Sequence, residues 1–137
     1  MYVLDTNVIL ELRRGKPHQS LEVRAWADGQ PSSKLFLSAI TVLELEMGIL
    51  ALDRRTHTQG NALRTWLTGV RKAFAGRSLA FTDIAATICA ALYVPNHRSE
   101  RGAIVAATAF EHGFTVVTRN ETDFASTGVA LVNPWTL

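Results

Sequence analysis

The chain of 137 residues contains one cysteine, Cys89, so the sequence excludes a disulfide within the chain. Cys89 lies in the apolar stretch IAATICAALYV, where we expect it to pack as a small hydrophobic residue. No apolar run approaches the roughly 18 residues that a membrane-spanning helix needs. The start MYVLD has neither a basic segment nor a long apolar segment of the kind found in signal peptides. These absences predict a cytoplasmic protein with no membrane partner.

Several sequence signatures of catalysis are also missing. The four histidines show no metal-binding spacing such as HExxH, and one cysteine cannot build a zinc site. No GxxxxGK[ST], GxGxxG or GxSxG motif is present, which argues against nucleotide-cofactor enzymes and serine hydrolases. Lysine is scarce: 11 of the 14 cationic side chains are arginines, which bind phosphate and carboxylate equally well. With a net charge of only +2, a phosphate-bearing partner is permitted but not required.

The apolar segments that are present alternate between two kinds. Short runs of strand type occur at residues 2–4, 35–37, 79–81, 114–117 and 129–132. Longer stretches with helical periodicity occur at residues 20–29, 40–55, 60–75, 83–93 and 102–112. Strands that alternate with helices predict an α/β fold with a mainly parallel five-stranded sheet flanked by helices on both faces. The length and the 47% hydrophobic content fit a single domain over residues 1–137.

Polar residues follow two of the predicted strands. Asp5 comes after the first strand, and Thr118-Arg119-Asn120 comes after the fourth. Because ligand sites in open α/β sheets collect beyond the carboxyl ends of the strands, we expect both segments at one edge. Asp123 follows closely and is able to return to the same edge. Asp5 also has a second explanation, because aspartate is a favoured helix N-cap.

A further carboxylate, Glu44, lies on an unexpected face of the helix predicted from residue 40. At 100° per residue it shares a face with apolar and small residues, namely Ile40, Leu43, Met47, Gly48 and Ala51. A carboxylate buried there needs a cation or several donors, unless it lies at the rim of the core. A second apolar face of this helix suits either the sheet or a partner helix, and consists of Val42, Leu45, Ile49 and Leu52. If Asp5, Glu44 and Asp123 converge, their repulsion favours a divalent cation, and oxygen ligands select Mg²⁺ or Mn²⁺.

Four segments together resemble a known family. They are MYVLDTNVILEL, LSAITVLELEMGI, IVAATAFEHGFTVVTRNETDF and the closing NPW. In this order they resemble the PIN-domain ribonuclease toxins of bacterial toxin–antitoxin pairs, the VapC family, with FitB-like proteins as a subgroup. The resemblance covers almost the whole chain. It implies a PIN fold and a type II toxin that cleaves RNA phosphodiesters as an Mg²⁺-dependent endoribonuclease, with Mn²⁺ as the alternative ion.

The resemblance also implies residue roles and partners. The implied catalytic set is Asp5, Glu44, Asp123 and Asn120, of which the three carboxylates bind the metal. The implied substrate-binding residues are Thr6 and Arg119. The implied partners are a cognate VapB-type antitoxin, the RNA substrate and a second copy of the chain in a higher toxin–antitoxin assembly. Operator DNA is reached only through the antitoxin.

One position departs from the family pattern, which has an aspartate four residues before the AATA stretch. Here that position is Gly102, so the expected third metal ligand is missing, and we expect weaker metal binding and slower cleavage. Glu100 replaces it only if the helix starts later and the preceding loop turns inward. Two functions stay open: an impaired endoribonuclease, and a degenerate PIN domain that binds RNA or antitoxin without cleaving. Gly102 is either a natural loss or a substitution introduced so that a toxic protein can be expressed.

Overall fold

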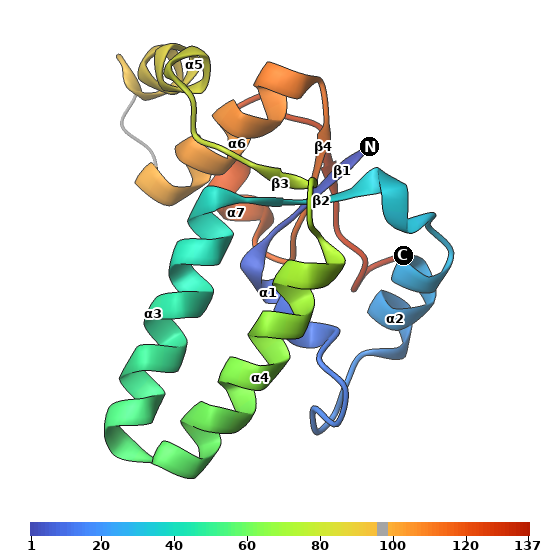
Figure 1. Ribbon diagram of the computed structural model, residues 1–137. Coiled ribbons are helices and arrows are strands. Elements are labelled where there is room, and N and C mark those ends of the chain that lie inside the picture. Colours follow the sequence, from blue (N-terminus) through green and yellow to red (C-terminus); the bar gives the residue numbers. More distant parts are fainter. Residues whose placement is uncertain (96–98) are drawn as a thin grey trace.

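A computed structural model describes residues 1–95 and 99–137, and its strands form one parallel sheet in the order β3-β2-β1-β4-β5 (Figure 1). The strands are β1 (Tyr2–Leu4), β2 (Leu35–Ser38), β3 (Ser78–Leu79), β4 (Thr115–Val117) and β5 (Leu131–Val132). The predicted α/β fold with a five-stranded parallel sheet is confirmed. The two edge strands are shorter than predicted, because each pairs with a neighbour on one side only.

The helices lie on both faces of this sheet. They are α1 (Thr6–Glu11), α2 (Leu21–Asp28), α3 (Ala39–Arg55), α4 (His57–Ala73), α5 (Asp83–Tyr93), α6 (Glu100–His112) and α7 (Glu121–Phe124), with a 3₁₀ turn at Ser32–Lys34. Helices α3 and α4 run side by side and extend away from the sheet (Figure 1). Within the described ranges, every helix is too short or too polar to cross a membrane.

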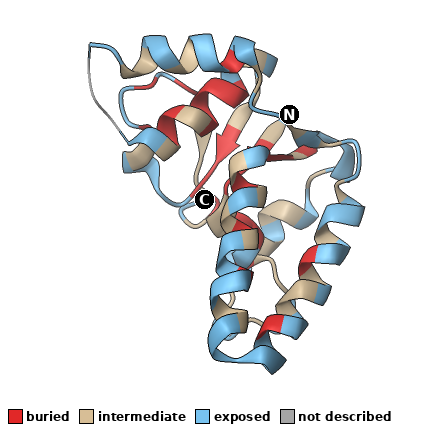
Figure 2. Cartoon of the chain, turned by 60° about the vertical axis from the view of Figure 1, so that its left-hand side comes forward, coloured by how far each residue is buried: buried red, intermediate tan, exposed pale blue. Residues whose placement is uncertain are grey.

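Side chains of the central strand alternate between two cores. Leu4 points to the first core, where it packs with Val8 of α1 and Leu45 of α3. Val3 points to the opposite face and packs with Val105 of α6 and with Phe124 of α7. This alternation is expected for a strand buried on both sides. Figure 2 shows the buried residues concentrated in the sheet and in α6, while α3 and α4 are mostly exposed far from the sheet.

Helix α6 approaches the sheet closely because its inner face is built from small residues. From Gly102 to Ala109, only Ile104 is not buried. The helix begins at Ser99, whose hydroxyl accepts the Gly102 N–H at 3.2 Å. Gly113 caps its end with φ +70°, a left-handed conformation that glycine adopts without strain. The buried residues Gly102 and Ala103 pack the first turn of α6 against its neighbours at the sheet edge.

The strand order sets the place of a binding site. From β1 the chain continues to β2 and β3 on one side, and then returns to β4 and β5 on the other side. The carboxyl ends of β1 and β4 therefore flank the point where the winding direction changes, which is where open α/β sheets bind ligands. Asp5 and Thr118 are the residues that directly follow these two strands.

Candidate active site at the carboxyl edge of the sheet

Asp5 is fully buried at this edge, with 0% exposure. Its Oδ1 accepts the Thr6 N–H at 2.9 Å, so it caps α1 as the local alternative predicted. Its Oδ2 accepts the Thr118 hydroxyl at 2.7 Å and lies 3.4 Å from the Asn7 amide nitrogen. Asp5 is therefore a helix cap and also part of a polar cluster that joins the ends of β1 and β4.

Glu44 reaches the same cluster from the first half of α3. Its Oε1 accepts the Thr6 hydroxyl at 2.6 Å. The assignment of Glu44 to a buried apolar face was wrong, because Leu43 and Met47 on that face are 50% and 59% exposed. The sheet instead packs against the face that carries Leu45 and Ile49, which confirms core packing for the second apolar face. Glu44 lies at the rim of the core, where it turns toward Asp5.

Arg101, in the first turn of α6, joins the two carboxylates. Its Nε donates to Glu44 Oε2 at 2.6 Å, and its Nη2 donates to Glu44 Oε1 at 2.8 Å, a bidentate pairing. The same Nη2 also pairs with Asp5 Oδ1, and Nη1 lies 3.3 Å from Asp5 Oδ2. The guanidinium therefore fills the space between Asp5 and Glu44, and only 25% of the Arg101 side chain is exposed.

The charges in this cluster stabilise one another. Burial raises the pKa of Glu44, but hydrogen bonds from Arg101 and Thr6 and the Arg101 charge outweigh it and leave that pKa below 4.5. The hydrogen bonds from Glu44 and Asp5 raise the pKa of Arg101 above its ordinary value, despite partial burial. The guanidinium is therefore charged at physiological pH.

Gly102 lies beside this ion pair, against the backbone of α7. A Cβ added at Gly102 would collide with the carbonyl oxygen of Asp123 and lie 3.0 Å from its carbonyl carbon. The space that a third carboxylate side chain needs is therefore taken by the α7 backbone. Over the described ranges, no three Asp, Glu, His or Cys side chains are grouped so that they could hold a metal ion.

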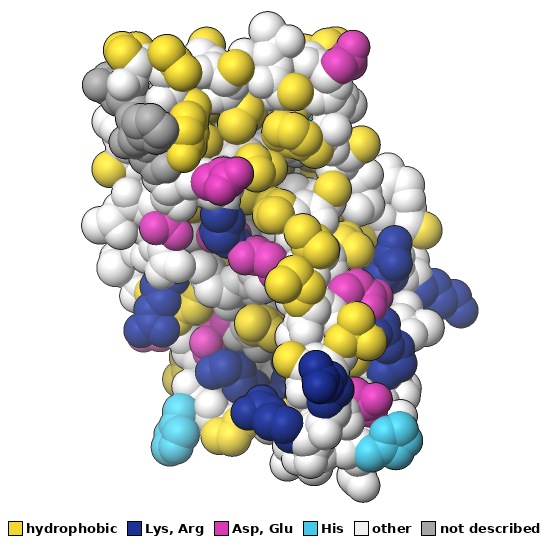
Figure 3. Space-filling view, turned by 90° about the vertical axis from the view of Figure 1, so that its left-hand side faces the viewer, with side chains coloured by type: hydrophobic (Ala, Val, Ile, Leu, Met, Phe, Trp, Pro, Cys, Tyr) yellow, Lys and Arg dark blue, Asp and Glu magenta, His cyan; other side chains and the backbone are white. Residues whose placement is uncertain are grey.

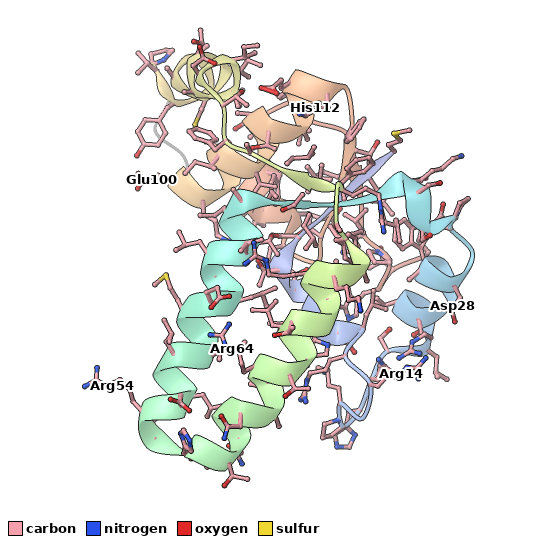
Figure 4. All side chains as sticks on the ribbon, viewed as in Figure 1. Arg14, Asp28, Arg54, Arg64, Glu100 and His112 are labelled. Carbon is pink, nitrogen blue, oxygen red and sulfur yellow. The ribbon has the colours of Figure 1, made fainter. Side chains whose placement is uncertain are left out.

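The remaining predicted residues lie near the edge but do not bind the two carboxylates directly. The Arg119 N–H donates to Asn7 Oδ1 at 3.2 Å, and the Arg119 guanidinium lies 5.3 Å from the ring centre of Trp135. The Asn120 N–H donates to the Thr118 hydroxyl at 3.0 Å. Glu100 begins α6 (Figure 4), lines a separate apolar pocket with Phe81, and so does not replace the missing ligand. Of the six predicted site residues, the structure brings together Asp5, Thr6 and Glu44.

Sequence reasoning missed Arg101 as a site residue. A signal was present, because a cation in the first turn of a helix faces the positive end of the helix dipole. Such a position is unfavourable unless a carboxylate meets it. The adjacent Gly102, at the place of an expected ligand, pointed to the same site.

As arranged here, the residues do not fit a divalent cation. Mg²⁺ and Mn²⁺ need several oxygen ligands converging on one point. At this point the two available carboxylates already share a guanidinium, whose positive charge repels a metal ion. Asp5, Glu44 and Arg101 therefore form a closed ion pair and not a set of metal ligands.

Comparisons with known proteins place the chain in a family. Residues 2–129 match the PIN domain model. The VapC ribonuclease Y4jK of Sinorhizobium fredii is 41% identical, with 98% of both chains covered. Toxin FitB of Neisseria gonorrhoeae is 39% identical over 98% of this chain and 99% of that protein. The solved structure of FitAB bound to an IR36 DNA fragment superposes with a TM-score of 0.90 at 34% identity, covering 100% of this chain and 97% of that chain. The chain therefore belongs to the PIN-domain family, on the branch of VapC ribonucleases and FitB toxins.

Proposed function

We propose that this protein is the toxin subunit of a type II toxin–antitoxin pair and acts on RNA as an endoribonuclease with strongly reduced activity. Similarity over nearly the whole chain to a VapC ribonuclease and to toxin FitB supports the toxin assignment. The solved relative is a complex of FitAB with DNA, which supports a cognate antitoxin that carries the pair to operator DNA. A homodimer of this chain within that assembly belongs to the same proposal.

The contacts of Arg101 carry the proposed loss of activity. The resemblance to VapC ribonucleases implies a divalent metal at this site. In this chain Arg101 joins Asp5 and Glu44, and Gly102 supplies no third carboxylate. With their oxygens bound to a guanidinium, the two carboxylates are not free to take a proton from water or to hold a metal ion that would lower the pKa of that water. An RNA phosphodiester bound at this edge therefore lacks a free carboxylate and a metal ion to promote its cleavage.

The test compares RNA cleavage with antitoxin binding. Single-stranded RNA is the suitable substrate class, because unpaired segments can be spread into a groove. We expect this chain to form a stable complex with its cognate antitoxin, and to cleave RNA more than about 100-fold slower than a VapC ribonuclease assayed beside it with Mg²⁺ and with EDTA. If no complex forms, the assignment to a toxin–antitoxin pair is wrong. If the chain cleaves RNA at the relative's rate and EDTA abolishes that cleavage, the proposed loss of activity is wrong.

A second function is favoured by the same ion pair. A chain that binds its antitoxin and RNA but cleaves nothing, even as a folded double variant with Arg101→Ala and Gly102→Asp, is a binding module. Detectable cleavage by that double variant, and little by the unaltered chain, would instead support a ribonuclease weakened at these two positions.

A further inference from the structure

We propose that Arg101 is a built-in substitute for a metal ion: its guanidinium holds Asp5 and Glu44 together, and the folded chain binds no divalent cation at this site. The proposal rests on the proposed function only for the expectation that related nucleases use a metal. It concerns what this chain binds, and its test involves neither RNA nor antitoxin.

The first argument is geometric. Four nitrogen–oxygen contacts join the guanidinium to the two carboxylates, and the two to Glu44 measure 2.6 and 2.8 Å. The Thr6 hydroxyl lies 3.3 Å from Arg101 Nη2 and 2.6 Å from Glu44 Oε1. The guanidinium thus contacts every side-chain oxygen of the two acids. A cation bridging Asp5 and Glu44 would have to displace it.

The second argument concerns charge. Two carboxylates and one guanidinium leave a net charge of −1, whereas a divalent ion added beside Arg101 would place three positive charges against two negative ones. Arginine cannot relieve this repulsion by losing its proton, because its pKa is far above physiological pH. Metal binding therefore requires that Arg101 leave and that its pairing with buried Asp5 be broken.

The third argument concerns the fixed position of Arg101. The Ser99 cap fixes where α6 begins, and the buried residues Gly102 and Ala103 pack its first turn against the rest of the chain. At Gly102 the absence of a Cβ lets the Asp123 carbonyl of α7 pack against this turn. Gly102 therefore removes a ligand and also permits the packing that keeps α6 in place, while Arg101 supplies the charge that the acids need.

Direct Mn²⁺ titration tests this inference, with free Mn²⁺ measured by electron paramagnetic resonance. We expect no saturable site in the unaltered chain up to about 1 mM Mn²⁺, and the same Tm in Mn²⁺, Mg²⁺ or EDTA. Arg101→Gln leaves two unpaired acids, so we expect Mn²⁺ affinity to rise at least about tenfold. Its Tm should fall by more than about 5 °C and recover in part when Mn²⁺ is added.

The matched control is Arg64→Gln. Arg64 lies between α3 and α4 (Figure 4), and donates to Glu46 at 2.7 Å in a more exposed ion pair. This variant makes the same chemical change away from the sheet edge, so we expect no gain in Mn²⁺ affinity and little change in Tm.

Two results would overturn the inference. One is saturable Mn²⁺ binding by the unaltered chain that Glu44→Gln abolishes. The other is a folded Arg101→Gln protein that binds Mn²⁺ no better than the unaltered chain. If Arg101→Gln does not fold, titration of the unaltered chain still decides, because a site there overturns the inference and its absence supports it. Complex formation with antitoxin is measured separately, so either proposal can fail alone.

Discussion

Two adjacent residues, Arg101 and Gly102, determine the chemistry of this site. Three carboxylates would carry a charge of −3, and the present set of Asp5, Glu44 and Arg101 carries −1. A single substitution introduced to silence a toxin accounts for Gly102 but not for the contacts of its neighbour. The bidentate pairing of Arg101 and the packing of the Asp123 carbonyl against Gly102 favour a natural loss.

Restoring an aspartate at position 102 alone should not restore cleavage. In Gly102→Asp the new Cβ collides with the Asp123 carbonyl oxygen, and Arg101 still pairs with the two acids. We expect the free energy of unfolding to fall by about 1–3 kcal/mol, as for other overpacked sites. Urea unfolding measures the loss, and RNA cleavage in Mg²⁺ should stay at the level of the unaltered chain.

Two alanine variants separate the steric cause from the charge. Gly102→Ala adds only the Cβ, and we expect it to destabilise. Gly69→Ala makes the same change in α4 with no heavy atom within 4 Å, and should stabilise by up to about 1 kcal/mol because alanine favours helix. If both variants are stabilised alike, α7 moves aside freely and the steric explanation is wrong.

At the scale of elements, Glu11 ties the end of α1 to the start of α2. It is 6% exposed, accepts the Ser20 N–H at 2.7 Å and pairs with Lys16 at 3.1 Å. The Gln19 amide also donates to the Glu11 carbonyl at 2.7 Å. Asp5 caps the start of α1, and the contacts of Glu11 fix the end of the same helix. The Glu11 tether therefore helps to hold α1 in place at the site.

The Glu11 tether should give stability a defined pH dependence. Burial raises the pKa of Glu11, but the Ser20 N–H and Lys16 outweigh it, so this pKa lies below 4.5 in the folded chain. A group with a lowered folded pKa stabilises above its unfolded pKa and loses that contribution as pH falls through the folded pKa. We expect Glu11→Gln to lower the free energy of unfolding by about 1–3 kcal/mol at neutral pH.

Urea unfolding at neutral pH and at more acid pH, below about 4, checks this dependence. The difference between Glu11→Gln and the unaltered chain should shrink in acid. Asp28→Asn, at an exposed carboxylate at the other end of α2, is the control and should differ little from the unaltered chain at either pH. A difference for Glu11→Gln that stays constant over this range would show that its charge is not what stabilises the loop.

At the scale of the whole molecule, sequence predicts what depends on local pattern. Residues 2–4 and 83–93 form β1 and α5 with the predicted bounds, because hydrophobic periodicity and stop signals are local. The pairing of Arg101 with Asp5 was not predicted, since it depends on where α6 lies relative to a residue 96 positions earlier in the chain. The helical wheel of α3 also failed at Glu44, because a wheel groups residues by face but does not say which face meets the sheet.

An exposed apolar face of α3 is where we expect the antitoxin to bind. Leu43, Met47 and Leu50 are 50%, 59% and 59% exposed, and they form a row along α3. Figure 3 shows apolar side chains collected over this side of the molecule. A pocket of about 470 Å³ between α5 and α6 lies on the same half and is lined by Tyr93 and Ile104 among others. Exposed apolar area of this kind marks protein interaction sites.

Leu43→Asp should therefore weaken antitoxin binding without unfolding the chain. Truncating or charging a central apolar contact costs about 2 kcal/mol or more, which corresponds to at least about a 30-fold rise in the Kd of the complex. The Tm should change little, because half of the Leu43 side chain is already exposed. Calorimetric titration with the antitoxin measures the loss.

Leu21→Asp is the matched control, since Leu21 is 80% exposed on α2, which lies on the other side of the molecule from α3 (Figure 1). Equal Kd values for the two variants would place the antitoxin elsewhere.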